Sequence, residues 1–251
     1  MRISFQLDLR VTFLAVAVLP VLLSLGVWQL NRADEKREII EQRQIKQSQP
    51  DVALSSLLNT PKDRLAFTPV ELRGQFDSER LFFLDNAIYE SSVGYEILQP
   101  FEYLDLSSNS KHWALVNRGW VKAPGSRDQL PEVYPAPSGP ITIRGEIYSI
   151  PGESYVLEPQ EFTRDQWPQV IQTVDIEQIS AAMGIEFFPK QIRLNADEPS
   201  ALLAYWEPVA VTPEKHVGYA VQWFSMSIGL ILWFLFASTN VWNVIRNKFS
   251  N

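Results

Sequence analysis

The chain has 251 residues, of which 46% are hydrophobic and 20% are charged, as in an ordinary folded protein. It contains no cysteine, which excludes disulfides, thiol nucleophiles, cysteine zinc sites and covalently attached haem. The net charge of −7 is unevenly placed, because residues 31–216 contain 18 of the 22 Lys and Arg and 28 of the 29 Asp and Glu. An acidic block of this kind repels phosphate backbones, which argues against nucleic acid as a partner.

The first of two segments without Asp, Glu, Lys or Arg is residues 11–30. A helix of this length covers about 30 Å, the thickness of the hydrocarbon core of a bilayer. Pro20 and Gly26 suit such a span, because membrane helices contain both residue types more often than soluble helices do. The alternative is a cleaved signal peptide with Arg2 and Arg10 at its basic start. The segment is long for a signal and no small-residue cleavage site follows it, so the sequence favours an uncleaved anchor.

The region between the two uncharged segments, residues 31–216, begins with a polar stretch and continues as a β-rich domain. Residues 32–49 are rich in helix formers and lack Gly and Pro, which predicts that the first helix continues until Pro50. A short helix is expected at Ile176–Met183, closed by Gly184. Short β-rich runs bounded by turn residues predict a small antiparallel sheet or barrel. The expected strands are Val70–Arg73, Arg80–Leu84, Tyr95–Pro100, Trp113–Val121, Ile141–Ile147, Val170–Val174, Gln191–Leu194 and Leu202–Val209.

The second uncharged segment is residues 217–245, and we expect the helix over 217–242 to cross the membrane. Basic residues in the two tails, 1–10 and 243–251, predict that both termini are cytoplasmic. Residues 31–216 would then lie in the periplasm of a bacterium, outside its inner membrane. The predicted fold is therefore an α+β membrane protein, a two-helix transmembrane hairpin that encloses a β-rich extracytoplasmic domain.

The sequence contains none of the common catalytic or nucleotide-binding motifs, neither GxGxxG, GxxxxGK[ST], HExxH nor GxSxG. His112 lies alone in an expected strand, where a histidine is more often structural than catalytic. We therefore expect that the protein is not an enzyme. An anchored extracytoplasmic enzyme or sensor is the disfavoured alternative.

His216 stands out because it lies in the first turn of the second span, at the outer membrane interface. On a helix His216, Tyr219, Ala220 and Trp223 occupy positions i, i+3, i+4 and i+7, so they share one face. An imidazole, a small residue and two aromatic rings on one face could hold a flat macrocycle, with the histidine as axial metal ligand. The competing interpretation is an interfacial histidine that hydrogen-bonds to the loop or to water, and the spacing alone favours this simpler role.

The outer end of the first span carries a matching group, Trp28, Gln29 and Arg32. Because the two outer ends meet the same domain, we expect these residues to face His216 across the hairpin. Arg32 could pair with an acidic group near the interface; the simpler interpretation is that it anchors the span.

Asn117-Arg118-Gly119-Trp120 follows an apolar run in an expected strand. We expect both large side chains to serve the fold, with Trp120 packed into the core of the sheet and Arg118 paired with an acid.

Several motifs in order carry a resemblance to a known family. They are Leu25-Gly26-Val27-Trp28-Gln29 with Arg32 and Lys36; Gly74 and Phe76 with Leu84-Asp85-Asn86; Gly94-Tyr95 before Pro100; Val116-Asn117-Arg118-Gly119-Trp120-Val121; Gly145 before Pro151; and His216 with Tyr219-Ala220 and Trp223-Phe224. On these motifs the chain resembles, over nearly its whole length, the surfeit locus protein 1 family of membrane assembly factors for haem-copper cytochrome c oxidase.

The resemblance implies a role in maturation of oxidase subunit I, and some bacterial members resemble haem a carriers. It implies His216 as the haem ligand, and we expect Tyr219, Ala220, Trp223 and Trp28 to border the macrocycle and Arg32 to neutralise a propionate. The implied partners are subunit I with its assembly intermediates, the lipid bilayer and a haem a synthesis enzyme. Without cysteine and with three methionines the chain is poorly equipped to deliver copper. A haem-free scaffold that holds immature subunit I is the alternative.

Overall fold

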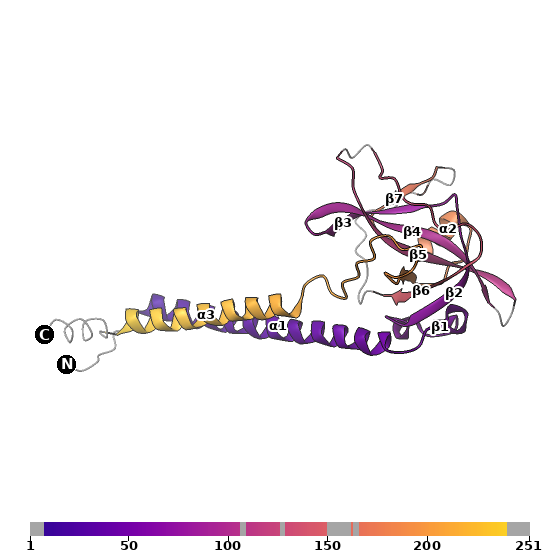
Figure 1. Ribbon diagram of the computed structural model, residues 1–251. Helices are drawn as coiled ribbons and strands as arrows, with labels where there is room; N and C mark the ends of the chain where they lie inside the picture. The colour runs from indigo at the N-terminus through magenta and orange to yellow at the C-terminus, as the bar shows by residue number, and fades with distance from the viewer. Residues whose placement is uncertain (1–7, 106–108, 126–128, 150–161, 163–165, 240–251) are drawn as a thin grey trace. The chain divides into compact units, whose positions relative to one another are not determined.

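The computed structural model describes residues 8–105, 109–125, 129–149, 162 and 166–239 (Figure 1). The chain divides into two compact units, one formed by residues 1–41 with 208–251 and the other by residues 42–207. We call them the helix unit and the barrel unit. Two apolar helices flank a β-rich domain, which confirms the predicted α+β class.

The helix unit consists of α3 (Pro213–Ser238) and most of α1 (Leu9–Gln47), which lie side by side (Figure 1). Both helices are long and apolar enough to cross a membrane, so they are two candidate transmembrane helices, consistent with a membrane protein. α1 continues past the first apolar segment to Gln47, as its helix-forming composition predicted. The second predicted span, 217–242, extends past Ser238 to residues outside the described part of the chain.

The barrel unit is built from one eight-stranded sheet in the order β1-β2-β6-β8-β5-β4-β3-β7. A further pairing, between β2 and β4, closes five of the strands into a barrel. The elements are β1 (Val52–Ala53), the 3-10 turns η1 (Leu54–Leu57) and η2 (Lys62–Arg64), β2 (Pro69–Phe76), β3 (Phe82–Tyr89), β4 (Ser92–Asp105), β5 (Ser110–Lys122), β6 (Ile141–Tyr148), β7 (Gln169–Ile171), α2 (Ile176–Met183) and β8 (Gln191–Leu194).

Closure of the barrel depends on a close approach between β2 and β4 at Gly74. Gly74 pairs with Ile141 of β6 on one side and with Tyr103 of β4 on the other. A Cβ atom at Gly74 would lie 1.9 Å from the carbonyl oxygen of Glu102, so no side chain fits at this position. The absence of a side chain therefore lets one short strand serve both neighbours.

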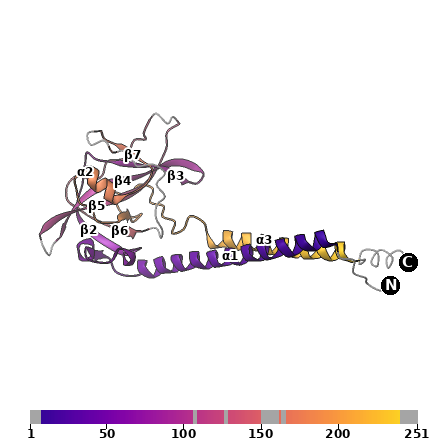
Figure 2. The ribbon, with the colours of Figure 1, turned by 180° about the vertical axis from the view of Figure 1, so that it is seen from behind.

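Two of the apolar clusters in the barrel unit lie in different layers, one inside the barrel and one between the sheet and α2. The interior of the barrel is filled by buried side chains from β2, β4, β5, β6 and β8, including Val70, Phe101, Val116, Ile143 and Ile192. A second cluster lies where α2 covers the sheet, with Ile179 packed among side chains such as Phe82, Leu98 and Leu115 (Figure 2). Asp175 caps α2 by accepting hydrogen bonds from two backbone amides, and Gly184 ends it with φ +66°.

Most of the predicted elements are confirmed, including α2 and β8 at their predicted bounds. The predicted strand Leu202–Val209 is wrong, because this segment makes only a single bridge, between Leu203 and Trp120. Leu202 instead packs against the cluster of Phe83, Tyr95 and Ile97, and Trp206 donates its indole N–H to the carbonyl oxygen of Leu194. The short strand β1 was not predicted, since two residues give no alternating pattern.

Candidate functional site

The two helices of the helix unit pack through small side chains. The buried residues are Ala15, Gly26 and Ala33 in α1 and Pro213, Ala220, Ser227 and Ser238 in α3. Gly26 meets the ring of Phe224 so closely that a Cβ atom there would lie 2.6 Å from a ring carbon. Small residues allow membrane helices to approach each other in this way. This close contact fixes how far α3 is shifted along α1, and so which residues of the two helices lie level with each other.

His216 lies in the first turn of α3 and faces α1, as its position in the sequence predicted. Its Nδ1 atom lies 2.7 Å from Oε1 of Gln29, across the helix contact. Because an amide oxygen only accepts, this pairing places the ring proton on Nδ1. Nε2 then carries the lone pair, and it has no hydrogen-bond partner in the part of the chain that the structure describes. The half-buried imidazole is thus held by one nitrogen and left open at the other.

Arg32 lies one turn beyond Trp28 on α1, with its guanidinium carbon 5.7 Å from the centre of the indole ring. It also donates a hydrogen bond of 2.5 Å to Oε2 of Glu35. This bond, with lesser contributions from the charges of Arg32 and Lys36, lowers the pKa of Glu35, although desolvation acts in the opposite direction. Arg32 therefore has an acidic partner near the expected interface, supplied by its own helix.

The four residues predicted to share a face of the second span are divided between two environments. Ala220 is 1% exposed, whereas Tyr219 is 51% exposed and Trp223 is half-buried. Ala220 thus lies in the contact with α1, and the phenol ring of Tyr219 lies outside it. The sequence pattern could not separate them, because it does not show where the partner helix lies.

Arg32 and Tyr219 nevertheless border the same flank of the helix pair. The helices are antiparallel, since Phe224 meets Gly26 while the earlier residue His216 meets the later residue Gln29. Arg32 comes one position before the buried Ala33, and Tyr219 comes one position before the buried Ala220. Each is therefore rotated by about 100° around its helix axis from the residue that faces the other helix, and in the same sense along the chain. In antiparallel helices the same rotation leads to the same side. Trp28 joins this flank through its contact with Arg32.

These residues fit a haem held by one axial histidine. The open Nε2 of His216 suits the metal, the exposed rings of Trp28 and Tyr219 suit a macrocycle, and Arg32 suits a propionate. No group of three or more His, Cys, Asp or Glu side chains that could cage a bare metal ion occurs among the described residues.

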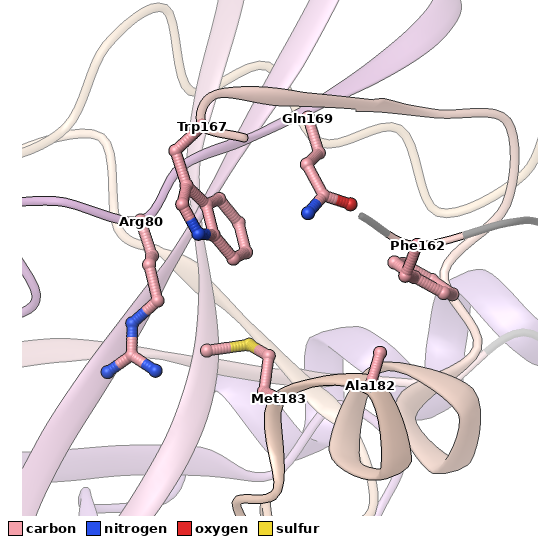
Figure 3. A pocket seen from close by; sticks show the side chains of 6 residues that line it. All are labelled: Arg80, Phe162, Trp167, Gln169, Ala182 and Met183. Carbon is pink, nitrogen blue, oxygen red and sulfur yellow. The ribbon is translucent and has the colours of Figure 1, made fainter. Parts of the chain in front are cut away.

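The barrel unit contains a small cavity of about 80 Å³ between α2 and the segment leading into β7 (Figure 3). Trp167, Phe162 and Met183 surround it, and Arg80 lies at its side. Arg80 is already paired with Asp77 and lies against the ring of Trp113. A cavity of this size is far smaller than the 300–1,000 Å³ or so of typical ligand sites.

Arg118 and Trp120 serve the fold, but not through the predicted contacts. Arg118 is the extra residue of a β-bulge, since Ile97 pairs with Gly119 and Leu98 with Asn117. The prediction of an acidic partner is wrong among the described residues: the guanidinium donates to the carbonyl oxygens of Ser200 and Tyr134 and to Oε1 of Gln99. Burial lowers the pKa of Arg118 to about 10, which leaves it charged at neutral pH.

Trp120 is only half-buried and lies outside the three core clusters. Its ring lies 5.5 Å from that of Tyr89, and its Nε1 donates to the carbonyl oxygen of Ala87 at 3.1 Å. The prediction that it packs into the core is therefore wrong. The indole instead covers the backbone at Gly94, where a Cβ atom would lie 2.4 Å from the ring.

Comparison with known proteins gives a consistent result over most of the chain. A model of the SURF1 family matches residues 16–228. A SURF1-like protein of Rickettsia conorii is 24% identical over 238 residues, covering 89% of this chain and 89% of the relative. A SURF1-like protein of Rickettsia felis is 23% identical over 248 residues, covering 94% of this chain and all of the relative.

Proposed function

The chain belongs to the SURF1 family, and we propose that it holds haem a through His216 and assists its insertion into subunit I of a haem-copper cytochrome c oxidase. The family is linked to cytochrome oxidase assembly and is a family of assembly factors, not of enzymes. The finer role rests on the helix unit.

The observation that carries the proposal is the pairing of His216 with Gln29. A histidine ligand usually donates its second ring N–H to an acceptor, which fixes the tautomer and makes the ligating nitrogen more basic. Gln29 provides such an acceptor at 2.7 Å from Nδ1. Polar side chains also hydrogen-bond across membrane helices in purely structural contacts, so the open Nε2 is the feature that favours a ligand role over a structural one.

The flanking residues have separate tasks in this proposal. Trp28 and Tyr219 offer ring surfaces to the macrocycle, and Arg32 offers a cation to a propionate. Haem a, when bound, would supply an iron centre that accepts the imidazole nitrogen of His216. Ala220 acts indirectly, because its small side chain lets α3 lie close enough to α1 for His216 to meet Gln29.

We further propose that both termini are cytoplasmic, that the barrel unit lies in the periplasm of a bacterial inner membrane, and that the partners are subunit I, its assembly intermediates and a haem a synthesis enzyme. Two apolar helices and basic tails support this topology. A reporter active only in the periplasm, fused after Asn251, should be silent. Activity of that reporter would contradict the topology.

The haem-to-protein ratio tests the cofactor. Full-length protein is purified from cells that make haem a, as wild type, as His216→Ala and as His112→Ala. His112 is the other histidine of the chain and lies in β5 beside Ser110, so it serves as the matched control. We expect His216→Ala to lose most of the haem and His112→Ala to retain it. Equal ratios in all three proteins would exclude His216 as the ligand.

A haem-free scaffold for immature subunit I is the second candidate. It accounts for the link of the family to oxidase assembly without a cofactor, and in it the hydrogen bond between His216 and Gln29 serves only to hold the two helices together. If all three purified proteins lack haem but copurify with subunit I, the scaffold is the better description.

A further inference from the structure

A cleft of about 510 Å³ lies beside the β-bulge of β5. Its walls come from β5, from the proline-rich segment around Tyr134 and from the segment 199–203. The backbone of this wall is fixed, because the amide of Trp120 donates to the carbonyl oxygen of Leu203 at 2.9 Å and the amide of Leu202 to that of Arg118 at 2.7 Å. The volume falls in the range of roughly 300–1,000 Å³ that small-molecule sites occupy.

Arg118 provides the only charged side chain in the lining of this cleft, among the described residues. The three hydrogen bonds of Arg118 use three of the five N–H donors of a guanidinium. No described carboxylate lies within ion-pair distance, although the side chain is only 2% exposed. A buried charge without a counter-charge is costly, so an anion that reaches the remaining donors would be favoured.

The rest of the lining is apolar or aromatic. Leu203 is 41% exposed and Tyr134 is 83% exposed, so both present ring or aliphatic surface to solvent. Trp120, Pro199 and Leu202 complete the wall. The region 31–216 is strongly acidic, yet the described lining contains no Asp or Glu. The cleft is thus set apart chemically from the surface around it.

We propose that this cleft binds a small amphiphilic carboxylate, with its carboxylate at Arg118 and its apolar body against Trp120, Tyr134 and Leu203. The site lies wholly within the barrel unit and does not involve His216. The test of this site therefore does not depend on the haem proposal.

Two probes with the same apolar body test the proposal: 4-phenylbutyrate and the uncharged 4-phenylbutanol. Binding to the full-length protein in phosphatidylcholine nanodiscs is measured by equilibrium dialysis, with empty nanodiscs as the background. We expect one saturable site for the carboxylate and binding of the alcohol weaker by about tenfold or more, because a charge-assisted hydrogen bond is lost.

Variants at the rim locate the site without disturbing Arg118. Leu203→Asp places an acid at the cleft but keeps the backbone contacts, and it should reduce carboxylate binding about tenfold or more through like-charge repulsion. Leu58→Asp is the matched control, because Leu58 is 39% exposed and lies in no described wall of the cleft. It should bind as the wild type does. Absence of saturable binding, equal affinity for the two probes, or equal behaviour of the two variants would overturn the proposal.

Discussion

The helix unit and the barrel unit each contain an Arg–Glu pair, and the two pairs show how differently the units use charge. In the helix unit Arg32 and Glu35 meet at 2.5 Å, but their side chains are 44% and 47% exposed. In the barrel unit Arg43 and Glu146 meet at 2.8 Å with side chains 14% and 6% exposed. The shorter pair is the weaker one, because water screens it and each partner is solvated when the bond breaks.

The buried pair also has more partners. Arg43 donates two hydrogen bonds to Glu146 and one to the carbonyl oxygen of Trp206, and Gln47 donates a third bond to Glu146. This network ties the last turns of α1 and the segment before Glu207 to strand β6. The buried pair thus fixes the architecture of the barrel unit, whereas Arg32 and Glu35 of the helix unit remain exposed.

The largest effect is expected from breaking the buried pair. Glu146→Ala leaves the guanidinium of Arg43 buried without its counter-charge, and we expect the free energy of unfolding to fall by about 3–5 kcal/mol. Chemical unfolding of the full-length protein, followed by tryptophan fluorescence, measures the change. Glu35→Ala is the control and should unfold as the wild type does. Equal unfolding curves for the two variants would show that burial does not separate the pairs.

The sequence predicted the helix unit better than the barrel unit, and the reason is physical. An uncharged stretch of 20 residues needs no distant partner to be recognised as a span. That His216 faces Gln29 follows from the hairpin alone, because the two helices must meet at the same end. Closure of the barrel instead depends on pairing between Gly74 and Tyr103, and no local pattern encodes that contact.

Two errors concern residues whose partners are backbone atoms. Arg118 was expected to find an acid, but two of its three acceptors are carbonyl oxygens, which every residue carries and no composition reveals. Leu202–Val209 has the composition of a strand, yet only Leu203 pairs. The backbone partners of Leu203 depend on how this segment crosses the β-bulge of β5. Gly119, next to the bulge residue Arg118, has a φ of +123°, which no alternation pattern predicts.

A smaller effect is expected from Gln29, which tests whether the helix unit supports a ligand site. Gln29→Leu keeps the volume of the side chain but removes the acceptor of the His216 Nδ1 proton. Loss of such a supporting bond typically weakens metal-centre affinity by about 10–100-fold, so we expect the haem affinity to fall by that order. Haem titration of the purified protein measures it. Gln222→Leu, an exposed glutamine of α3, is the matched control and should leave the affinity unchanged; equal affinities for the two variants would remove Gln29 from the site.

The smallest effect is expected from variants of the exposed pair Arg32–Glu35. The change in haem retention distinguishes two roles of Arg32. If Arg32 only anchors the span, Arg32→Ala and Glu35→Gln should both leave haem retention unchanged. If Arg32 holds a propionate, Arg32→Ala should weaken retention by roughly a few-fold, and Glu35→Gln should strengthen it slightly by releasing the guanidinium from its hydrogen bond.

In the wild type, protonation of Glu35 at low pH releases the guanidinium of Arg32 in the same way. The pKa of Glu35 is lowered, chiefly by the hydrogen bond from Arg32, so the pair is intact above the ordinary carboxylate range and is lost as the pH falls through the lowered pKa. Haem off-rates measured with an apo-globin acceptor at pH 7 would compare the three proteins, and slower release from Arg32→Ala than from the wild type would contradict the propionate role.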